Sequence, residues 1–486
     1  MKIKRIELKN FFQFKDVAID LTYPKGHEKA GQPLEKVCII GQSGTGKTSL
    51  LRLMKWFISR DRGICEDSIL AVPKDGIASI DFVVGDLEYR LSNNGPDLEY
   101  SSFVIKGKGK GKGKPSPADC DRILFEEIQK IAPLMINFPT ESLSQRNFWG
   151  KKGNLNLSPF MQEIKAKFVE RVKSVEEGAK KSKKNAFRDK LDITQLIDFD
   201  FEDIGEIWNV VEKDIRNYLL EESDHKSKIA DILDQKDAGL SKIRKMQDEL
   251  ESWRANNPHP LTKLAEYLDL ILAKLGLRVK RDIELKTIDK QGVVQLQTIE
   301  GLDVPLESWS TGTWQMIKTI IPLYQMKPAH AVILVDEPER SLYPDFQATI
   351  IDTYVSLAKG SQFFFATHSP MIASCFEPWE IVELKFDPDC KSVFQELQYE
   401  DKNQVDHYMY FPEYLRWDSI LRRIFDLKKE GNSKRIQALI KLSELEVQIE
   451  KLKKTNELNS EEGQKKKQLC LELNRLLGWR TGSDGQ

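Results

Sequence analysis

The sequence predicts an α/β protein whose mixed β-sheet, with antiparallel strands, is split by a helical insertion and followed by a C-terminal helical hairpin. Short runs at 37–40, 332–335 and 363–366 are apolar throughout, as expected for parallel strands that are buried on both faces. Residues 159–253 are charged, nearly free of glycine and apolar at helical spacing. The predicted regions are therefore a first half of the sheet domain at 1–158, a helical insertion at 159–260, a second half at 261–400 and a helical region at 401–486.

The composition is that of a soluble protein with more than one domain. The chain has 486 residues, of which 40% are hydrophobic and 31% are charged. No run approaches the roughly 18 apolar residues that span a membrane, and MKIKRIELKN lacks the apolar region of a secretory signal. The six cysteines are scattered without a CxxC pair, so we expect reduced thiols in a cytoplasmic protein without membrane contact. The net charge of −1 gives no overall attraction to nucleic acid.

The first region is expected to hold antiparallel strands. Ile3, Ile6 and Leu8 mark the first, and the ranges 80–91 and 98–105 have the composition of others. The segment KGKGKGKGK at 106–114 cannot bury a core. A solvated loop and a contact with DNA phosphates both remain open for it.

The later regions show the same two periodicities. Strand alternation returns at Ile283, Leu285 and Ile288 and again at Val294 and Leu296. One apolar stripe in the tail comprises Leu439, Leu442, Leu445, Ile449 and Leu452. The segment LNSEEGQ interrupts this stripe before a second helix, which predicts an αα-hairpin or a short coiled coil.

The segment VCIIGQSGTGKTSL combines a buried strand, a glycine-rich loop and the start of a helix. Gly41 to Thr48 satisfies the pattern GxxxxGK[ST], in which glycines let backbone N–H groups surround phosphate oxygens. Lys47 is expected to reach the β- and γ-phosphates, and the Thr48 hydroxyl to ligate Mg²⁺, at the positive end of the helix. The predicted nucleotide-binding residues are Gly41, Gln42, Ser43, Gly44, Thr45, Gly46, Lys47, Thr48 and Ser49. The cofactors implied are ATP and Mg²⁺.

Two further buried strands end in residues that suit nucleotide hydrolysis. Asp336 and Glu337 follow the run at 332–335, where the carboxyl end of a central strand lies near a ligand site. Asp336 fits a Mg²⁺ ligand acting through water, and Glu337 is placed to orient or deprotonate the attacking water. His368 follows the run at 363–366. We interpret it as a γ-phosphate sensor, with a structural histidine as the alternative.

The order of these motifs, with WSTGTWQ at 309–315 between the first two, resembles the ATP-binding-cassette (ABC) ATPases of the SMC, RecF and OLD (overcoming-lysogenisation-defect) group. The opening KNFFQFKDVAIDL is similar to that group's first strand, and INFPTES at 136–142 is similar to a strand end of its OLD-like branch. The resemblance covers residues 1 to about 150 and about 265 to 400. It implies an ABC-type ATPase head, whereas the helical segments match no motif firmly.

In this group WSTGTWQ is the signature motif, normally LSxGxxQ, and it implies a site shared between subunits. By this resemblance Ser310, Gly312 and Gln315 belong to the nucleotide site, and the Ser310 hydroxyl and Gly312 N–H cap the γ-phosphate held by another copy. A hydroxyl, a glycine and a helix N-terminus are a reasonable seat for an anion. Departures from the pattern lie at Trp309, Thr313 and Trp314. The change at Trp309 is expected to repack, whereas those at Thr313 and Trp314 bear on the rate of hydrolysis, which is expected to be slow, more than on ATP binding.

The resemblance also implies a homo-oligomer, a dimer of heads or higher. The segment ERSLYP after Glu337 corresponds to the loop that touches the partner subunit. Gln145 is a candidate for the Q-loop glutamine of this group, with a plain loop glutamine as the alternative.

The ATPase is expected to control a separate protein. Asp387 and Asp389 in DPD suit a turn better than the nuclease motif of OLD proteins. The chain is similar to stand-alone ATPase subunits of anti-phage systems, such as AriA of PARIS and PtuA of Septu, which implies a nuclease or toxin effector as partner. YLRWDSILRRIF at 414–425 is similar to a tail motif of some of these ATPases.

Two other functions remain open, a RecF- or SMC-like ATPase in DNA repair or recombination and a structural scaffold that binds ATP with little turnover. DNA, or a phage protein that mimics DNA, is a further candidate partner. The basic residues that suggest it are Lys180, Lys181, Lys183, Lys184 and Arg188. A solvated helix face is the alternative reading of these residues.

Overall fold

The computed structural model describes residues 1–59, 76–85, 87–94, 97–99, 128, 131, 133–139, 195–198, 201–233, 240–283, 294–389, 391–427 and 431–477. The chain forms two compact units, Met1–Ile420 and Leu421–Gln486. The strands are β1 (Lys2–Phe11), β2 (Phe14–Asp20), β3 (Lys36–Gly41), β4 (Ile77–Val84), β5 (Leu87–Asn94), β6 (Asp97–Glu99), β7 (Leu134–Phe138), β8 (Gln195–Asp198), β9 (Leu277–Val279), β10 (Leu296–Thr298), β11 (Asp303–Val304), β12 (Val332–Asp336), β13 (Gln362–Ala366), β14 (Ile381–Phe386) and β15 (Val393–Glu396).

The helices are α1 (Lys47–Ser59), α6 (Phe201–Leu233), α7 (Leu240–Asn256), α8 (Pro260–Leu272), α10 (Thr311–Met326), α11 (Pro344–Leu357), α12 (Pro370–Ala373), α13 (Trp417–Arg423), α14 (Ser433–Lys454) and α15 (Glu461–Leu476). Short 3₁₀ turns are η2 (Ala273–Leu275), η3 (Leu306–Ser308), η4 (Pro378–Glu380) and η5 (Pro412–Tyr414).

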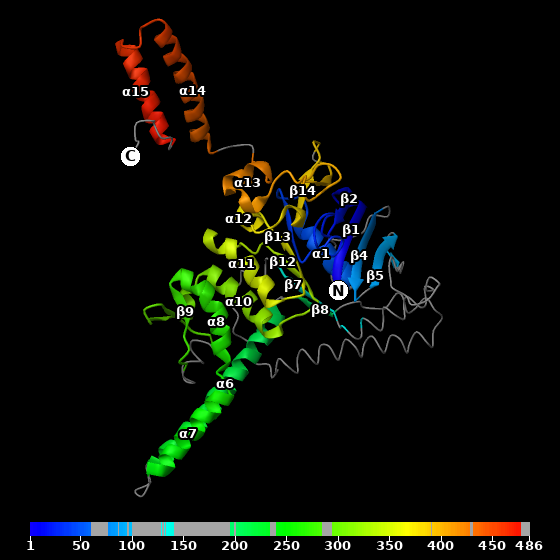
Figure 1. The fold of residues 1–486 in the computed structure, drawn as a ribbon, viewed down its shortest axis with the longest axis vertical. Helices are drawn as coiled ribbons and strands as arrows, with labels where there is room; N and C mark the ends of the chain where they lie inside the picture. The colour runs from blue at the N-terminus through cyan, green and yellow to red at the C-terminus, as the bar shows by residue number, and fades with distance from the viewer. Residues whose placement is uncertain are drawn as a thin grey trace. The chain divides into compact units, whose positions relative to one another are not determined.

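The large sheet of the first unit has an antiparallel half and a parallel half (Figure 1). Its strand order is β6-β5-β4-β1-β2-β15-β14-β3-β13-β12-β7-β8. Neighbours from β6 to β2 pair antiparallel, whereas β14, β3, β13, β12, β7 and β8 pair parallel. The parallel strands therefore end at one edge of the sheet, and the loops after β3, β12 and β13 meet there.

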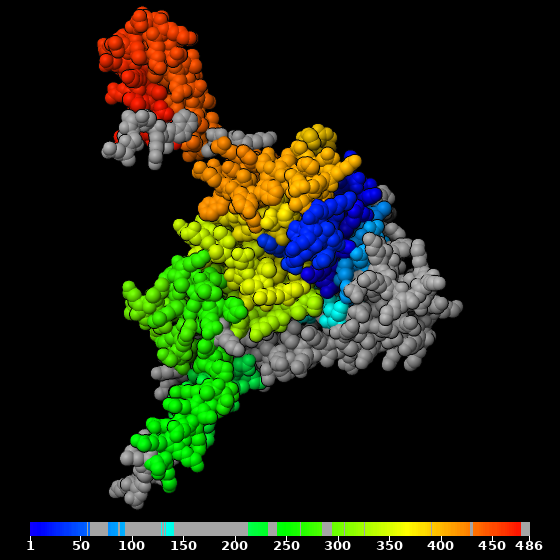
Figure 2. Space-filling view, in the orientation of Figure 1, coloured from blue at the N-terminus to red at the C-terminus, as the bar shows by residue number. Residues whose placement is uncertain are grey.

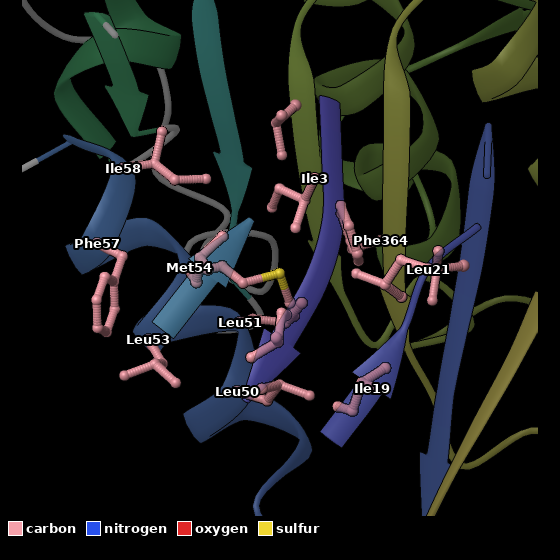
Figure 3. Packing of buried hydrophobic residues seen from close by; sticks show 14 of the residues in the cluster. Ile3, Ile19, Leu21, Leu50, Leu51, Leu53, Met54, Phe57, Ile58 and Phe364 are labelled. Carbon is pink, nitrogen blue, oxygen red and sulfur yellow. The ribbon is translucent and has the colours of Figure 1, made fainter. Parts of the chain in front are cut away.

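The apolar face of α1 anchors this helix to the sheet. Leu50, Met54 and Phe57 are buried in one cluster with Ile3 of β1 and Phe364 of β13, and Figure 3 shows these side chains between the helix and the strands. Full burial of such a side chain contributes about 1.5–3 kcal/mol. Because α1 begins at Lys47, the same packing fixes the end of the loop that precedes the helix.

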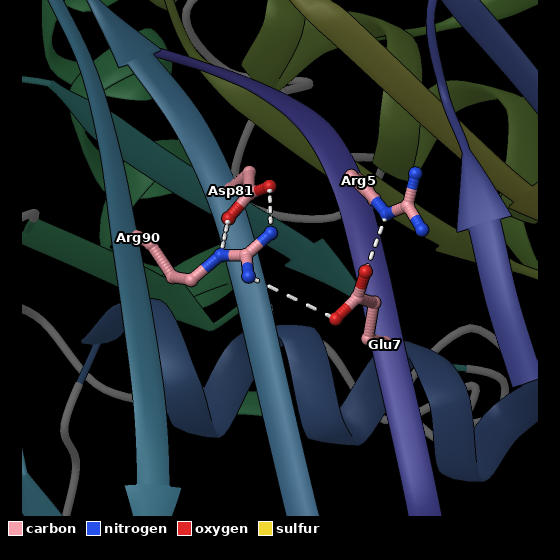
Figure 4. A network of polar contacts seen from close by, with 4 residues as sticks. All are labelled: Arg5, Glu7, Asp81 and Arg90. Carbon is pink, nitrogen blue, oxygen red and sulfur yellow. Dashed lines mark hydrogen bonds and ion pairs between the residues drawn. The ribbon is translucent and has the colours of Figure 1, made fainter. Parts of the chain in front are cut away.

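Charged side chains join three strands of the antiparallel half (Figure 4). Arg90 of β5 holds both carboxylate oxygens of Asp81 on β4, at 2.5 and 2.7 Å. Its Nη1 also lies 3.9 Å from Glu7 of β1, which accepts a hydrogen bond from Arg5 at 2.7 Å. The exposed Arg5–Glu7 pair contributes about 1 kcal/mol or less. The Arg90–Asp81 pair is partly buried and bidentate, and it links β4 to β5 in register.

Helices α6 and α7 form an antiparallel pair within the predicted insertion. Arg254 Nη2 donates to Glu222 Oε1 at 2.6 Å, and the rings of Tyr218 and Trp253 lie 4.9 Å apart. Figure 2 shows the pair in green. Helix α6 also contacts α8 and α10, so the insertion touches the helix that starts in the WSTGTWQ segment.

The second unit is a helical hairpin of α14 and α15. Leu442 and Leu445 of α14 are buried with Leu473 and Leu477, and Leu439 packs against them. The first part of the predicted stripe, Leu439 to Leu445, therefore faces α15, and the hairpin prediction is confirmed. Apolar side chains that the hairpin leaves exposed are Ile440, Val447, Leu471 and Leu476.

The predicted fold class is confirmed, with differences in local elements. The strand predicted at 80–91 is wrong, because Gly85, with φ +60°, turns the chain between β4 and β5. Ile283 lies outside any strand. DPD at 387–389 is a turn as predicted, since Asp387 accepts hydrogen bonds from the Lys391 N–H and the Ser392 hydroxyl, both at 2.7 Å.

Other predictions stay untested by the fold. The domain boundaries remain predictions, and the ranges 106–114, 161–172 and 180–188, with Leu285 and Ile288, lie outside the described residues. Cys38, Cys375 and Cys470, which the structure describes, are free. Within the described ranges, no helix has both the length and the apolar character that a membrane crossing requires.

Candidate nucleotide-binding site

The loop between β3 and α1 has a conformation that requires glycine. Gly41, Gly44 and Gly46 have φ values of +150°, +88° and +92°, which residues with side chains rarely adopt. A Cβ atom on Gly41 would lie 2.3 Å from a carbonyl oxygen of β14 and 2.7 Å from Thr45 Oγ1. The Thr45 hydroxyl donates to the Gln42 carbonyl oxygen at 2.8 Å, so the loop is also fixed internally.

Lys47 turns its ammonium group back into this loop. Its Nζ donates to the carbonyl oxygens of Gly41 at 3.0 Å and of Gln42 at 3.2 Å. Burial lowers the pKa of Lys47 to about 8, and the carboxylates of Asp336 and Glu337 oppose this decrease. An anion such as a phosphate would stabilise this poorly solvated cation.

The sheet brings Asp336 next to Thr48, 288 residues away in the sequence. Thr48 Oγ1 donates to Asp336 Oδ2 at 2.9 Å and lies 3.2 Å from Oδ1. Asp336 reaches this position because β12 pairs in parallel with β13, which in turn pairs with β3. A hydroxyl and a carboxylate at this spacing offer the oxygen ligands that Mg²⁺ prefers.

Glu337 and His368 lie on neighbouring loops at the same edge of the sheet. Glu337 has a φ of +52°, which is uncommon for a residue with a side chain and turns the chain sharply after β12. Its N–H donates to the Ala366 carbonyl oxygen at 2.8 Å. Burial lowers the pKa of His368, the Lys47 charge lowers it further, and Glu337 and Asp336 oppose the decrease. The imidazole is therefore mainly neutral at pH 7 and can donate a hydrogen bond to a phosphate oxygen.

A cavity of about 240 Å³ connects these groups. Its lining comprises Gln13, Ser43, Gly44, Gly46, Lys47, Thr48, Ser49, Asp336, Glu337 and His368. All of them except Gln13 are site residues that the sequence predicts. Gln13 comes from the turn between β1 and β2, where its carbonyl oxygen accepts a hydrogen bond from the Val393 N–H at 2.7 Å. Nothing in the residue type marks it in the sequence, and only the sheet order places it beside Gly46.

A second cavity, of about 530 Å³, adjoins the first along the Thr48–Asp336 pair. Its lining adds Arg52, Asn137 and Arg340. Asn137 lies in the segment INFPTES and Arg340 in ERSLYP, neither of which is expected from the sequence to line a pocket with α1, and no motif marks Arg52. The three come together because β7 and the turn after β12 approach α1 in the folded sheet. Gln145, the Q-loop candidate, lies outside the described residues.

Ser310 caps the N-terminus of α10, away from this pocket. Its Oγ accepts a hydrogen bond from the Thr313 N–H at 3.0 Å, while the residue itself is exposed. Trp309 and Trp314, two departures from the signature pattern, are buried with their rings 4.9 Å apart. No residue of 309–315 lines the cavity that contains Lys47.

The start of α10 packs instead on the turn at 337–342. A Cβ atom on Gly312 would lie 2.3 Å from the Ser341 carbonyl oxygen, so only glycine allows this approach. Gln315 is buried, and its Nε2 donates to the Pro338 carbonyl oxygen at 3.1 Å. The residues predicted from the signature thus touch the loop that carries Glu337, but not the Lys47 pocket of the same chain.

The residues present fit a nucleotide and Mg²⁺. Glycine is also required at Gly46, since its φ is +92° and a Cβ atom there would lie 2.1 Å from the Gln13 side chain and 2.8 Å from the Phe14 ring. In the described part of the chain, no three His, Cys, Asp or Glu residues gather as a metal site. A Mg²⁺ ion held by Thr48 and Asp336 would have its remaining ligands from phosphate oxygens of the nucleotide and from water.

Residues 1–373 match the family described as AAA ATPase domain. No curated protein sequence matches the chain significantly. Similar solved structures include an Smc head domain from Pyrococcus furiosus, with an extended coiled coil and bound to the C-terminal domain of ScpA. The identity is 13% and the TM-score 0.39, over 81% of this chain and 96% of that one. The SMC head domain from Thermotoga maritima is 10% identical with a TM-score of 0.37, over 82% of this chain and 99% of that one. Since the family match spans most of the chain, the protein belongs to the AAA ATPase domain family.

Proposed function

We propose that this chain binds ATP with Mg²⁺ at residues 41–49 and hydrolyses it at a site completed by a second copy of the chain. The observation that carries the proposal is the division of the site residues into two groups. Lys47 and His368 line one pocket, whereas Ser310 is exposed at the start of α10 and does not line it. A helix N-terminus with an exposed hydroxyl and a nearby glycine attracts anions. In this proposal it meets the phosphates that another copy holds.

Within the pocket each polar residue has a separate role. Bound Mg²⁺ would neutralise phosphate charge, and Thr48 and Asp336 are the residues that would hold it. Lys47 binds the phosphates through its charge. Glu337 accepts a hydrogen bond or a proton from the attacking water, and His368 donates to the γ-phosphate.

Two substitutions test the ATPase assignment. Glu337→Gln keeps the shape of the side chain but removes the base, so ATP affinity stays and kcat falls about 100-fold or more. Lys47→Ala removes the buried cation and weakens ATP binding itself. Phosphate release and nucleotide titration measure the two effects. Hydrolysis at the wild-type rate by Glu337→Gln would show that the carboxylate has another role.

A mixing experiment tests the shared site. Ser310→Arg puts a bulky cation at the start of α10, so we expect ATP binding at the Lys47 pocket without hydrolysis. Mixed with Lys47→Ala, it should regain a fraction of the activity, since a mixed dimer keeps one composite site with both halves intact. Full activity of Ser310→Arg alone refutes the shared site.

In the cell, we propose that the ATP-bound oligomer controls a separate nuclease or toxin effector in anti-phage defence. Two observations support a partner of this kind. Asp387 of DPD accepts hydrogen bonds within the turn between β14 and β15, which suits a structural role for this segment. The α14–α15 hairpin exposes Ile440, Val447, Leu471 and Leu476, which suits contact with another protein.

Expression in bacteria challenged with phage, with and without the neighbouring gene, tests this role. Protection or toxicity that needs both genes, and is lost with Lys47→Ala, supports effector control. If the pair has no effect while deletion of this gene alone sensitises cells to DNA damage, a repair function replaces it.

A further inference from the structure

The turn after β12 carries a second glutamate, Glu339, whose side chain lies under the His368 segment. The His368 N–H donates to Glu339 Oε1 at 2.8 Å, and the Thr367 hydroxyl also donates to this carboxyl group. The Oε2 atom is buried and, among the described residues, has no hydrogen-bond partner. Glu339 lines neither cavity at the edge of the sheet.

Burial at this position destabilises the ionised form of the Glu339 carboxyl group, and its hydrogen bonds offset part of this cost. Burial raises the pKa of Glu339, and the hydrogen bonds from the His368 N–H and the Thr367 hydroxyl oppose the increase. A glutamate that pointed into solvent would avoid the cost of desolvation. The contact therefore indicates a defined role for the carboxylate at this point of the chain.

Among the hydrogen bonds that fasten the turn at 337–342 to its surroundings, three are made by Glu337, Pro338 and Glu339. The Glu337 N–H binds the end of β13 at 2.8 Å, and Gln315 of α10 donates to the Pro338 carbonyl oxygen at 3.1 Å. Only the Glu339 carboxylate, of these three, reaches the residue that carries the imidazole. The Thr367 N–H in turn donates to a carbonyl oxygen of β3 at 3.0 Å, so this attachment is rigid on the far side.

We propose that Glu339 is a positioning residue for ATP hydrolysis. Its carboxylate holds the His368 backbone against the turn that carries Glu337, and so fixes the imidazole relative to the attacking water. Glu339 contacts neither the nucleotide nor the water. The inference rests on the proposed ATPase function of the pocket.

Four single variants and one double variant test this role. Glu339→Gln keeps an acceptor oxygen, so its kcat should stay within about threefold of wild type. Glu339→Ala removes the acceptor of a charge-assisted hydrogen bond, which predicts a 10- to 100-fold lower kcat with the KM for ATP within about threefold. In a His368→Ala background the same alanine should change kcat less than about twofold, because no imidazole remains to be positioned. The exposed Glu400→Ala serves as the matched control.

Hydrogen exchange of the segment at 364–372 gives a readout that does not need turnover. Glu339→Ala should speed exchange in this segment, whereas Glu339→Gln and Glu400→Ala leave it unchanged. A wild-type protein that binds ATP without hydrolysing it would refute the proposed function, while the exchange still reports whether Glu339 holds His368. Wild-type exchange and kcat in Glu339→Ala, or a Glu339→Gln as inactive as Glu337→Gln, would overturn the positioning role. Equal losses of kcat from Glu339→Ala with and without His368 would overturn it as well.

Discussion

Gly312→Ala is the smallest change that separates α10 from the turn after β12. The added methyl group would lie 2.3 Å from the Ser341 carbonyl oxygen and 3.2 Å from its carbonyl carbon. Since carbon–oxygen contacts relax at about 3.3 Å, the helix start and the turn must separate by about 1 Å. Overpacking of this size costs about 1–3 kcal/mol of stability. A misplacement of about 1 Å in a composite active site lowers the rate about 100-fold.

Phosphate release, ATP affinity and thermal unfolding of Gly312→Ala, measured beside Gly360→Ala, check this expectation. Gly360 has a φ of +85°, and a Cβ atom there would meet nothing within 4 Å, so its alanine adds backbone strain without a clash. We expect Gly312→Ala to lose hydrolysis while its ATP affinity stays within about threefold, because the Lys47 pocket is elsewhere. Gly360→Ala should lose about 1 kcal/mol of stability only. If Gly312→Ala keeps the wild-type rate of hydrolysis and unfolding temperature, the contact between Gly312 and Ser341 restrains neither segment. If Gly360→Ala loses hydrolysis to the same extent, the loss reflects a general destabilisation.

Three further predictions concern Mg²⁺, pH and the hairpin. Asp336→Asn should weaken Mg²⁺–ATP binding at least about tenfold and metal-free ATP binding less than about threefold, because the neutral amide no longer balances the charge of the ion. Nucleotide titration with and without a chelator measures both affinities. Equal losses of the two affinities would contradict a role in metal binding. Burial raises the pKa of Glu380 from 4.5 to about 7, and the charge of Lys36 opposes this increase. The folded state therefore binds the Glu380 proton more tightly than the unfolded state does. The stability that this proton contributes is fully present below about pH 4.5 and is lost as the pH rises through 7. Glu380→Gln should therefore remove up to about 3 kcal/mol of pH dependence between these values in denaturant unfolding, and an unchanged pH dependence would contradict the assignment. The Leu442 side chain is only 2% exposed, so Leu442→Ala should destabilise the α14–α15 hairpin by about 2–5 kcal/mol. Leu471 is half-exposed, so Leu471→Ala should cost about 0.5 kcal/mol or less. Hydrogen exchange measures both values, and similar losses would mean that the hairpin core lies elsewhere.

The sequence predicts the parallel half of the sheet better than its other parts, for a physical reason. Strands such as β12 and β13 are buried on both faces and are therefore apolar at every position. In the β4–β5 hairpin the apolar positions change phase at the turn, from Ile80, Phe82 and Val84 to Leu87, Tyr89 and Leu91. Gly85, with its φ of +60°, lies at this break, so one continuous strand over 80–91 does not fit the pattern. The strands β9, β10 and β11 have two or three residues each, too few for an alternation to be visible.

The candidate site divides in the same way. The loop at 41–49 is predictable because its glycines and Lys47 act within a few residues of one another. Gln13 and Asn137 reach the cavities only through the order of strands in the sheet, which local patterns do not encode. The contact of Glu339 with His368 depends on the parallel register that sets Asp336 opposite Ala366.

The turn at 337–342 gives the proposed oligomer a physical route between its two sites. On one side Glu339 binds the backbone of His368, which lines the Lys47 pocket. On the other side Pro338 accepts a hydrogen bond from Gln315, close to the exposed start of α10. If phosphates held by a second copy shift α10, the shift acts directly on the turn that carries Glu337, the proposed water-activating residue. Because such coupling is reciprocal for binding, ATP in the Lys47 pocket would in turn alter how α10 receives the partner. The ATPase and the assembly of the oligomer are therefore expected to depend on the same few hydrogen bonds.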